Sequence, residues 1–129
     1  MAFFLRPKDG SSYRGFNVDS SGWLKTDESN CTPVQFEVYK NKGVNYLKVN
    51  DPGSKWDGKY LSVNKNGYLG LYAWTGASGW SLSGKSLVSA YNGQIVGISS
   101  DGFYQAASGV QYPVTFENSS DGAFYAGLS

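Results

Sequence analysis

A short pattern around one turn recurs twice in this chain, and it limits the choice of fold more than any other feature. In residues 60–80, an expected strand with Leu61 and Val63 runs into residues 64–67 (NKNG), a hairpin signal because Asn and Gly tolerate positive φ. An aromatic residue, Tyr68, directly follows the turn glycine Gly67, and a second one, Trp80, stands thirteen positions after that glycine. The second spacing is fourteen in the other two copies of the pattern. The same positions are filled, in order, by Phe16, Val18, Gly22, Trp23 and Phe36, and by Val96, Ile98, Gly102, Phe103 and Phe116.

The repeat divides the chain into three units, at residues 1–43, 44–86 and 87–129. No unit of this size buries its apolar face alone, so we expect the three to close around a common core in one domain, with approximate threefold symmetry. A chain of 129 residues is long enough to build that core without disulfide bonds or metals. The pattern predicts these core residues: Val18, Leu24, Phe36, Val63, Leu69, Trp80, Ile98 and Phe116.

Short apolar runs between polar turns, together with 17 glycines and 10 tyrosines, predict an all-β chain. Counted in this way there are thirteen strands, one more than a closed set of twelve needs, so the first or the last is an accessory strand or one prediction is wrong. The predicted strands are residues 3–5, 14–18, 23–26, 34–39, 44–49, 61–63, 68–71, a strand at Trp80, 87–91, 95–99, 103–107, 114–117 and 123–128.

The residue types that most enzymes and metal sites need are missing. The chain has no histidine, which excludes an imidazole base, a Ser-His or Cys-His pair, and a His ligand for zinc. Cys31 is the only cysteine, so neither an internal disulfide nor a multi-thiolate site can form. The ten acidic residues are scattered and show no pairing of the kind that glycoside hydrolysis uses. We therefore expect a binding protein that is not an enzyme and holds no metal or cofactor.

Charge and hydropathy give no reason to expect nucleic acid or membranes as partners. The net charge of +1 offers no electrostatic basis for nucleic-acid or anionic-membrane binding. The apolar residues 2–5 are followed at once by Arg6, Pro7 and Lys8, which makes the segment too short for a signal peptide or a membrane span. We expect a protein that is cytoplasmic or secreted by a route that needs no signal peptide.

Surplus aromatic residues outside the expected core indicate a carbohydrate-binding site. Sugars are bound by an aromatic ring that covers the C–H side of the sugar and by planar polar groups that bind its hydroxyls. The alternative for each aromatic residue is that it fills the core or a dimer contact. The predicted site residues are Trp56, Asp57, Asn64, Asn66, Tyr72 and Trp74.

With its three units and its spacing of Phe16, Val18, Gly22 and Phe36, the whole chain resembles the β-trefoil, especially the fascin-like and ricin-B-like (R-type) repeats. In size and composition it resembles stand-alone trefoil lectins of bivalve molluscs such as mussels, and of fungi. This resemblance implies galactose- or GalNAc-terminated glycans on glycoproteins or glycolipids as partners, no metal, and a homodimer that agglutinates cells.

The residues that bind sugar in R-type lectins are mostly replaced by other types here. The position that holds an Asp in that family, between the two hydrophobic residues before the turn, is Asn17, Ser62 or Gly97 in the three units. The stacking aromatic residue of the family is matched only by Tyr72. The sugar hydroxyls are therefore expected to bind other groups, with Asp57, Asn64 and Asn66 as candidates.

Three other classes of function remain open, and for one of them, an interleukin-like signalling trefoil, the sequence offers nothing for or against. A trefoil protease inhibitor or toxin component would use one exposed loop, and residues 50–58 around Lys55 are the candidate. A fascin- or hisactophilin-like cytoskeletal module would share the repeat, although actin bundling favours basic patches or tandem copies.

Overall fold

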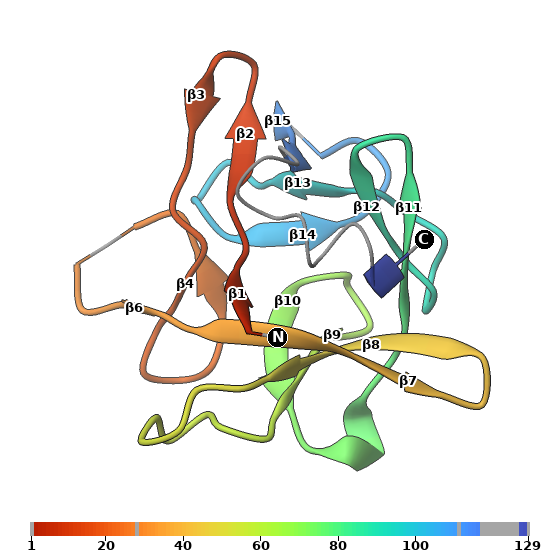
Figure 1. The fold of residues 1–129 in the computed structure, drawn as a ribbon. Coiled ribbons are helices and arrows are strands. Elements are labelled where there is room, and N and C mark those ends of the chain that lie inside the picture. The colour runs from red at the N-terminus through yellow and green to blue at the C-terminus, as the bar shows by residue number, and fades with distance from the viewer. Residues whose placement is uncertain (1, 28, 111, 117–126, 129) are drawn as a thin grey trace.

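The computed structural model describes residues 2–27, 29–110, 112–116 and 127–128, and the chain is all-β in architecture (Figure 1). Sixteen short strands and one 3₁₀ helix, η1 (Trp74–Gly76), are found in these residues. The strands are β1 (Phe3–Phe4), β2 (Pro7–Asp9), β3 (Ser12–Tyr13), β4 (Asn17–Val18), β5 (Leu24–Lys25), β6 (Thr32–Pro33), β7 (Gln35–Asn41), β8 (Val44–Val49), β9 (Tyr60–Val63), β10 (Leu69–Tyr72), β11 (Trp80–Ser83), β12 (Ser86–Ser89), β13 (Val96–Ile98), β14 (Tyr104–Ala106), β15 (Tyr112–Pro113) and β16 (Thr115–Phe116).

The strands form several small antiparallel sheets. The largest has the order β1-β7-β8-β9-β10, and the others are β11-β12, β14-β13-β15, β16-β2-β3 and β5-β4-β6. The longest hairpin joins β7 to β8, with Asn41 opposite Val44. Its two loop residues, Lys42 and Gly43, have φ angles of 52° and 79°, as a type I′ turn requires. The hairpin joins the two strands that were expected at residues 34–39 and 44–49.

The three predicted turns are built with the same hydrogen bonds. In each, the residue three positions before the turn glycine accepts a hydrogen bond from the glycine amide, at 2.9 to 3.1 Å. The side-chain oxygen of that same residue accepts a hydrogen bond from the amide of the aromatic residue after the glycine, at 2.9 to 3.2 Å. The sequence repeat is therefore also a repeat of local structure. The residues that accept both bonds are Asp19, Asn64 and Ser99.

Hydrogen bonds between the turns join them into a closed ring. The carbonyl of each turn glycine accepts an amide of another unit, at distances of 2.7 to 3.0 Å. The three bonds run from Leu71 N to Gly22 O, from Ala106 N to Gly67 O, and from Thr26 N to Gly102 O. The first unit thus contacts the second, the second the third, and the third the first.

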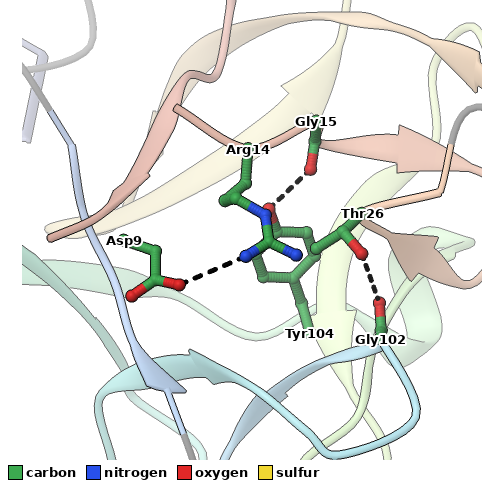
Figure 2. Close-up of polar contacts among 6 residues, drawn as sticks. All are labelled: Asp9, Arg14, Gly15, Thr26, Gly102 and Tyr104. Carbon is green, nitrogen blue, oxygen red and sulfur yellow. Dashed lines mark hydrogen bonds and ion pairs between the residues drawn. The ribbon is translucent and has the colours of Figure 1, made fainter. Parts of the chain in front are cut away.

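The core lies inside this ring of turns and the surrounding sheets. All eight residues predicted as core are buried, with exposed fractions of 6% or less. Tyr104 is fully buried among them, and its hydroxyl donates a hydrogen bond to the carbonyl of Gly15 (Figure 2). Nearby, Thr26 Oγ1 lies 3.4 Å from Gly102 O. Figure 2 shows that these contacts join the third unit to the first, close to the exposed ion pair of Arg14 with Asp9.

Some predictions concern residues outside the described part of the chain. The strand predicted at residues 123–128 falls mostly in residues 117–126, which the structure does not describe, and Gly127 and Leu128 do not lie in a strand. In the described residues, no helix is long and apolar enough to cross a membrane. The same residues contain no group of three or more acidic or cysteine side chains placed to hold a metal ion.

Candidate functional site

A hollow lies where the three turns meet, and it is lined by residues from all three units. Its volume is about 210 Å³. The first unit contributes one ring, and the second and third units each contribute one ring and one polar side chain. We call this site the turn hollow. Its lining residues are Trp23, Asn64, Tyr68, Asp101 and Phe103.

The three rings of the turn hollow occupy the same position in the repeat, directly after the turn glycine. The turn hydrogen bonds fix the backbone amides of Trp23, Tyr68 and Phe103, so each ring leaves its turn at a defined place. The rings of Tyr68 and Phe103 meet edge to face, with centroids 6.2 Å apart. All three side chains are half-buried, so part of each ring stays open to a ligand.

The polar side chains of the turn hollow supply a donor and an acceptor. Asn64 Oδ1 is used by the turn, since it accepts from Asn66 N and Tyr68 N at 3.0 and 2.9 Å. Its amide nitrogen is free of hydrogen bonds to the described residues and remains available as a donor. The exposed Asp101 accepts from the Ser99 hydroxyl through Oδ1, which leaves Oδ2 as an acceptor. The Lys25 ammonium lies 4.8 Å from the Phe103 ring centroid, at the edge of the site.

A second group of aromatic residues forms on the outer face of the five-stranded sheet. Four rings, one each from β7, β8, β9 and η1, lie within 4.9 to 6.4 Å of one another in every pair. We call this group the Tyr–Trp cluster. Trp74 and Tyr39 are 46% and 36% exposed, so part of the cluster is open to solvent. Its members are Tyr39, Tyr46, Tyr60 and Trp74.

The structure separates the six residues predicted as a binding site. Asn64 lines the turn hollow and Trp74 belongs to the Tyr–Trp cluster. Asn66 lies on the same turn as Asn64, with its backbone carbonyl 3.0 Å from Gln105 Nε2. Tyr72 is the last residue of β10, and its ring meets Trp23 edge to face at 6.5 Å. Burial raises the pKa of the Tyr72 phenol, and its hydroxyl is buried without a hydrogen-bond partner among the described residues.

The remaining two, Trp56 and Asp57, serve the structure of the loop at residues 50–58. Trp56 is half-buried and packs against the core, and a side chain on Gly22 would approach its ring to 3.0 Å. Asp57 Oδ1 accepts the amide of Asp51 at 2.8 Å. Lys55 folds back over the Trp56 ring at 4.8 Å, and its ammonium lies 3.3 Å from Ser20 O. Lys55 itself is exposed, so its side chain lies on the surface of the loop.

The positions that correspond to the R-type sugar site face inward. Asn17 and Ser62 are 6% and 1% exposed, and Gly97 is buried as well. Asn17 Nδ2 lies 3.4 Å from Asp27 O, and the Ser62 hydroxyl lies 2.8 Å from that of Ser78. These groups are used inside the protein and are not available for a ligand.

Sequence reasoning did not single out Trp23, Tyr68, Asp101 and Phe103 as site residues. The signal was present, because the repeat aligned the three rings at one position, directly after the turn glycine. When three such units close around an axis, residues at the same position of the repeat come together. The alignment of the three rings therefore could have indicated that they line one hollow. Comparison with known proteins adds no assignment, since the chain matches no protein-family model and no curated protein.

Proposed function

We propose that this chain is a carbohydrate-binding protein of the β-trefoil class that holds a sugar in the turn hollow. The trefoil assignment is supported by the repeated turns and by the closed ring of hydrogen bonds between them. The observation that carries the binding function is the lining of the hollow: three ring surfaces beside one amide donor and one carboxylate acceptor.

This lining matches the chemistry of a sugar better than that of other small ligands. Rings cover the C–H side of a sugar, while a hydroxyl both donates to a carboxylate and accepts from an amide. Asp101 and Asn64 offer that pair to neighbouring hydroxyls. The volume of about 210 Å³ is smaller than the roughly 300 to 1,000 Å³ of sites for drug-sized ligands, and it suits a single sugar ring. The resemblance to trefoil lectins makes galactose and GalNAc the first sugars to test.

In this function the protein binds a sugar without catalysing a reaction and without using a metal. Hydrolysis of a glycoside uses two carboxyl groups on either side of the scissile bond. Among the described residues that line the hollow, Asp101 is the one carboxylate. The groups named above bind hydroxyls directly, so the binding constant should be the same with and without EDTA.

The test is calorimetric titration of galactose and GalNAc into the wild-type protein and into Asp101→Asn, preceded by a glycan array to rank the sugars. Asp101→Asn keeps the shape of the side chain and removes the charged acceptor. We expect the binding constant to fall about tenfold or more, as for the loss of a hydrogen bond to a charged group. The melting temperature should stay unchanged because Asp101 is exposed.

Tyr91→Ala is the matched control, since Tyr91 is an exposed aromatic residue, 57% accessible, that does not line the hollow. It should bind like the wild type. A silent glycan array, or full affinity in Asp101→Asn, would contradict the proposal and direct attention to protein partners.

A further inference from the structure

The Tyr–Trp cluster extends from the buried Tyr60, which is 8% exposed, to the exposed rings of Trp74 and Tyr39 at the surface. Trp74 is 46% exposed, and η1 contributes no buried residue. The four centroids lie so close together that the rings pack on one another and leave no space for a group between them. The cluster is therefore a solid platform that is open to solvent at Trp74 and Tyr39, and not a cage.

The charged groups beside the platform can bind hydroxyls. The Lys48 ammonium lies 5.3 Å from the Tyr39 centroid and 5.7 Å from the Tyr60 centroid. In the register of β7 and β8, Glu37 stands opposite Lys48. Glu37 Oε2 accepts from Asn50 Nδ2 at 2.8 Å, so the carboxylate is held in place. An ammonium donor and a carboxylate acceptor thus accompany the exposed rings, just as a donor and an acceptor accompany the rings of the turn hollow.

Tyr72 connects the platform to the turn hollow. Its ring meets Trp23, which lines the hollow, at 6.5 Å. On the other side, Tyr72 stands directly opposite Tyr60 in the pairing of β10 with β9. The Tyr60 ring is 5.2 Å from Trp74, which begins η1 shortly after the end of β10. Tyr72 therefore stands between Trp23 of the hollow, which its ring contacts, and Tyr60 of the platform, which is its partner across the strand pair.

Gly76 holds η1 close to this connection. A side chain at Gly76 would approach the Tyr72 ring to 3.3 Å, so the backbone of η1 lies against Tyr72. The short helix therefore places Trp74 beside the path that leads from the hollow.

We propose that the ligand is an oligosaccharide whose terminal sugar occupies the turn hollow and whose later sugar stacks on the Tyr–Trp cluster at Trp74. This inference rests on the proposed function, since it requires a sugar in the hollow. The occupant of the platform is assigned to the same glycan because Tyr72 stands between Trp23 of the hollow and Tyr60 of the platform, and because both sites offer rings with a donor and an acceptor.

The test compares ligands of increasing length in two proteins. Galactose, galactobiose, galactotriose and galactotetraose are titrated into the wild type and into Trp74→Ala. In the wild type the binding constant should rise about three- to tenfold once the chain reaches the platform, as the energy of one aromatic stacking contact suggests. In Trp74→Ala this gain should disappear, while the binding constant for galactose itself stays the same.

Tyr39→Ala is a second variant of the platform and should reduce the same gain, and Tyr91→Ala is the exposed aromatic control that should keep it. Melting curves verify that each variant is folded. Galactose binding with no gain for longer chains in the wild type overturns this inference and leaves the proposed function intact. Failure of every ligand to bind overturns the proposed function itself.

Two further outcomes overturn the inference alone. If Trp74→Ala weakens galactose and the longer chains equally, the platform belongs to the first sugar site. If it turns a dimer into a monomer in sedimentation while the gain with length remains, the platform is a contact between two copies of the chain.

Discussion

At the scale of single residues, Tyr104 shows how one buried polar group ties the third unit to the first. Its ring is fully buried, and its hydroxyl donates to Gly15 O across 89 positions of sequence (Figure 2). Trp80 makes a comparable contact within the second unit, where its indole nitrogen donates to Leu61 O at 2.9 Å. These two aromatic residues of the core thus contribute both apolar area and one directed hydrogen bond each.

Replacing Tyr104 by Phe should lower stability without affecting the sugar site. The change keeps the ring and removes one hydrogen bond, which costs about 1 to 2 kcal/mol and about 3 to 12 °C in melting temperature. Galactose binding should be unchanged, because Tyr104 does not line the turn hollow. Thermal melts and titrations of the variant check both parts, and an unchanged melting temperature would show that the bond adds nothing to stability.

The same residue predicts a loss of stability in alkaline solution. Burial raises the pKa of the Tyr104 phenol, and the pKa of Tyr72 is shifted in the same direction for the same reason. Above about pH 10 an unfolded tyrosine loses its proton while the buried one keeps it. The unfolded state then binds fewer protons than the native state, so the free energy of unfolding falls as the pH rises. Denaturant titrations from pH 8 to 11 should show this fall, and Tyr104→Phe should show less of it.

At the scale of structural elements, the turn glycines decide whether the three units can close. Gly67 has a φ of 86°, and a Cβ there would lie 2.2 Å from the carbonyl oxygen of Ala106. This is the contact where the second turn meets the backbone of the third unit, so the glycine is needed both for its backbone angle and for its lack of a side chain.

Gly67→Ala should therefore be much more harmful than an alanine at a turn with free space. Gly84 has a φ of 61°, and a Cβ added there would meet no atom of the described residues within 4 Å, so Gly84→Ala should cost only about 1 to 2 kcal/mol for the left-handed backbone. Gly67→Ala adds the displacement of backbone and should also weaken sugar binding, because Tyr68 follows it in the hollow. Denaturant unfolding and titration of both variants provide the comparison, and equal losses would contradict the close approach.

Local features of these elements were predictable, and the contacts between them were less so. The turns around Gly22, Gly67 and Gly102 follow from short-range residue preferences, and the core residues follow from the repeat. The Tyr–Trp cluster depends on strand register, which sets Tyr39 opposite Tyr46 and Lys48 opposite Tyr60. Neither the strand register nor the path of η1 can be predicted from a short stretch of sequence, because both depend on contacts between distant segments. Trp74 was therefore predicted as a site residue without its three tyrosine neighbours.

At the scale of the whole molecule, the placement of the turn hollow changes what the repeat implies for binding. Three similar units suggest three similar sites, one in each unit. The hollow instead takes its rings from all three units and its two polar groups from different units, Asn64 from the second and Asp101 from the third. The residues at the corresponding inward positions of each unit, Asn17, Ser62 and Gly97, are buried. The repeat thus brings one ring from each unit to a single hollow.

The last prediction is therefore a stoichiometry of one sugar per chain. Calorimetric titration of galactose should give a single class of sites with a value of about one, whereas independent sites in the three units would give about three. A protein with one site cannot cross-link two cells as a monomer, so agglutination requires the proposed dimer, which would carry two sites. Size-exclusion chromatography of the same sample measures the number of chains. Agglutination by a monomer, or a stoichiometry of three, would show that the units bind sugar separately.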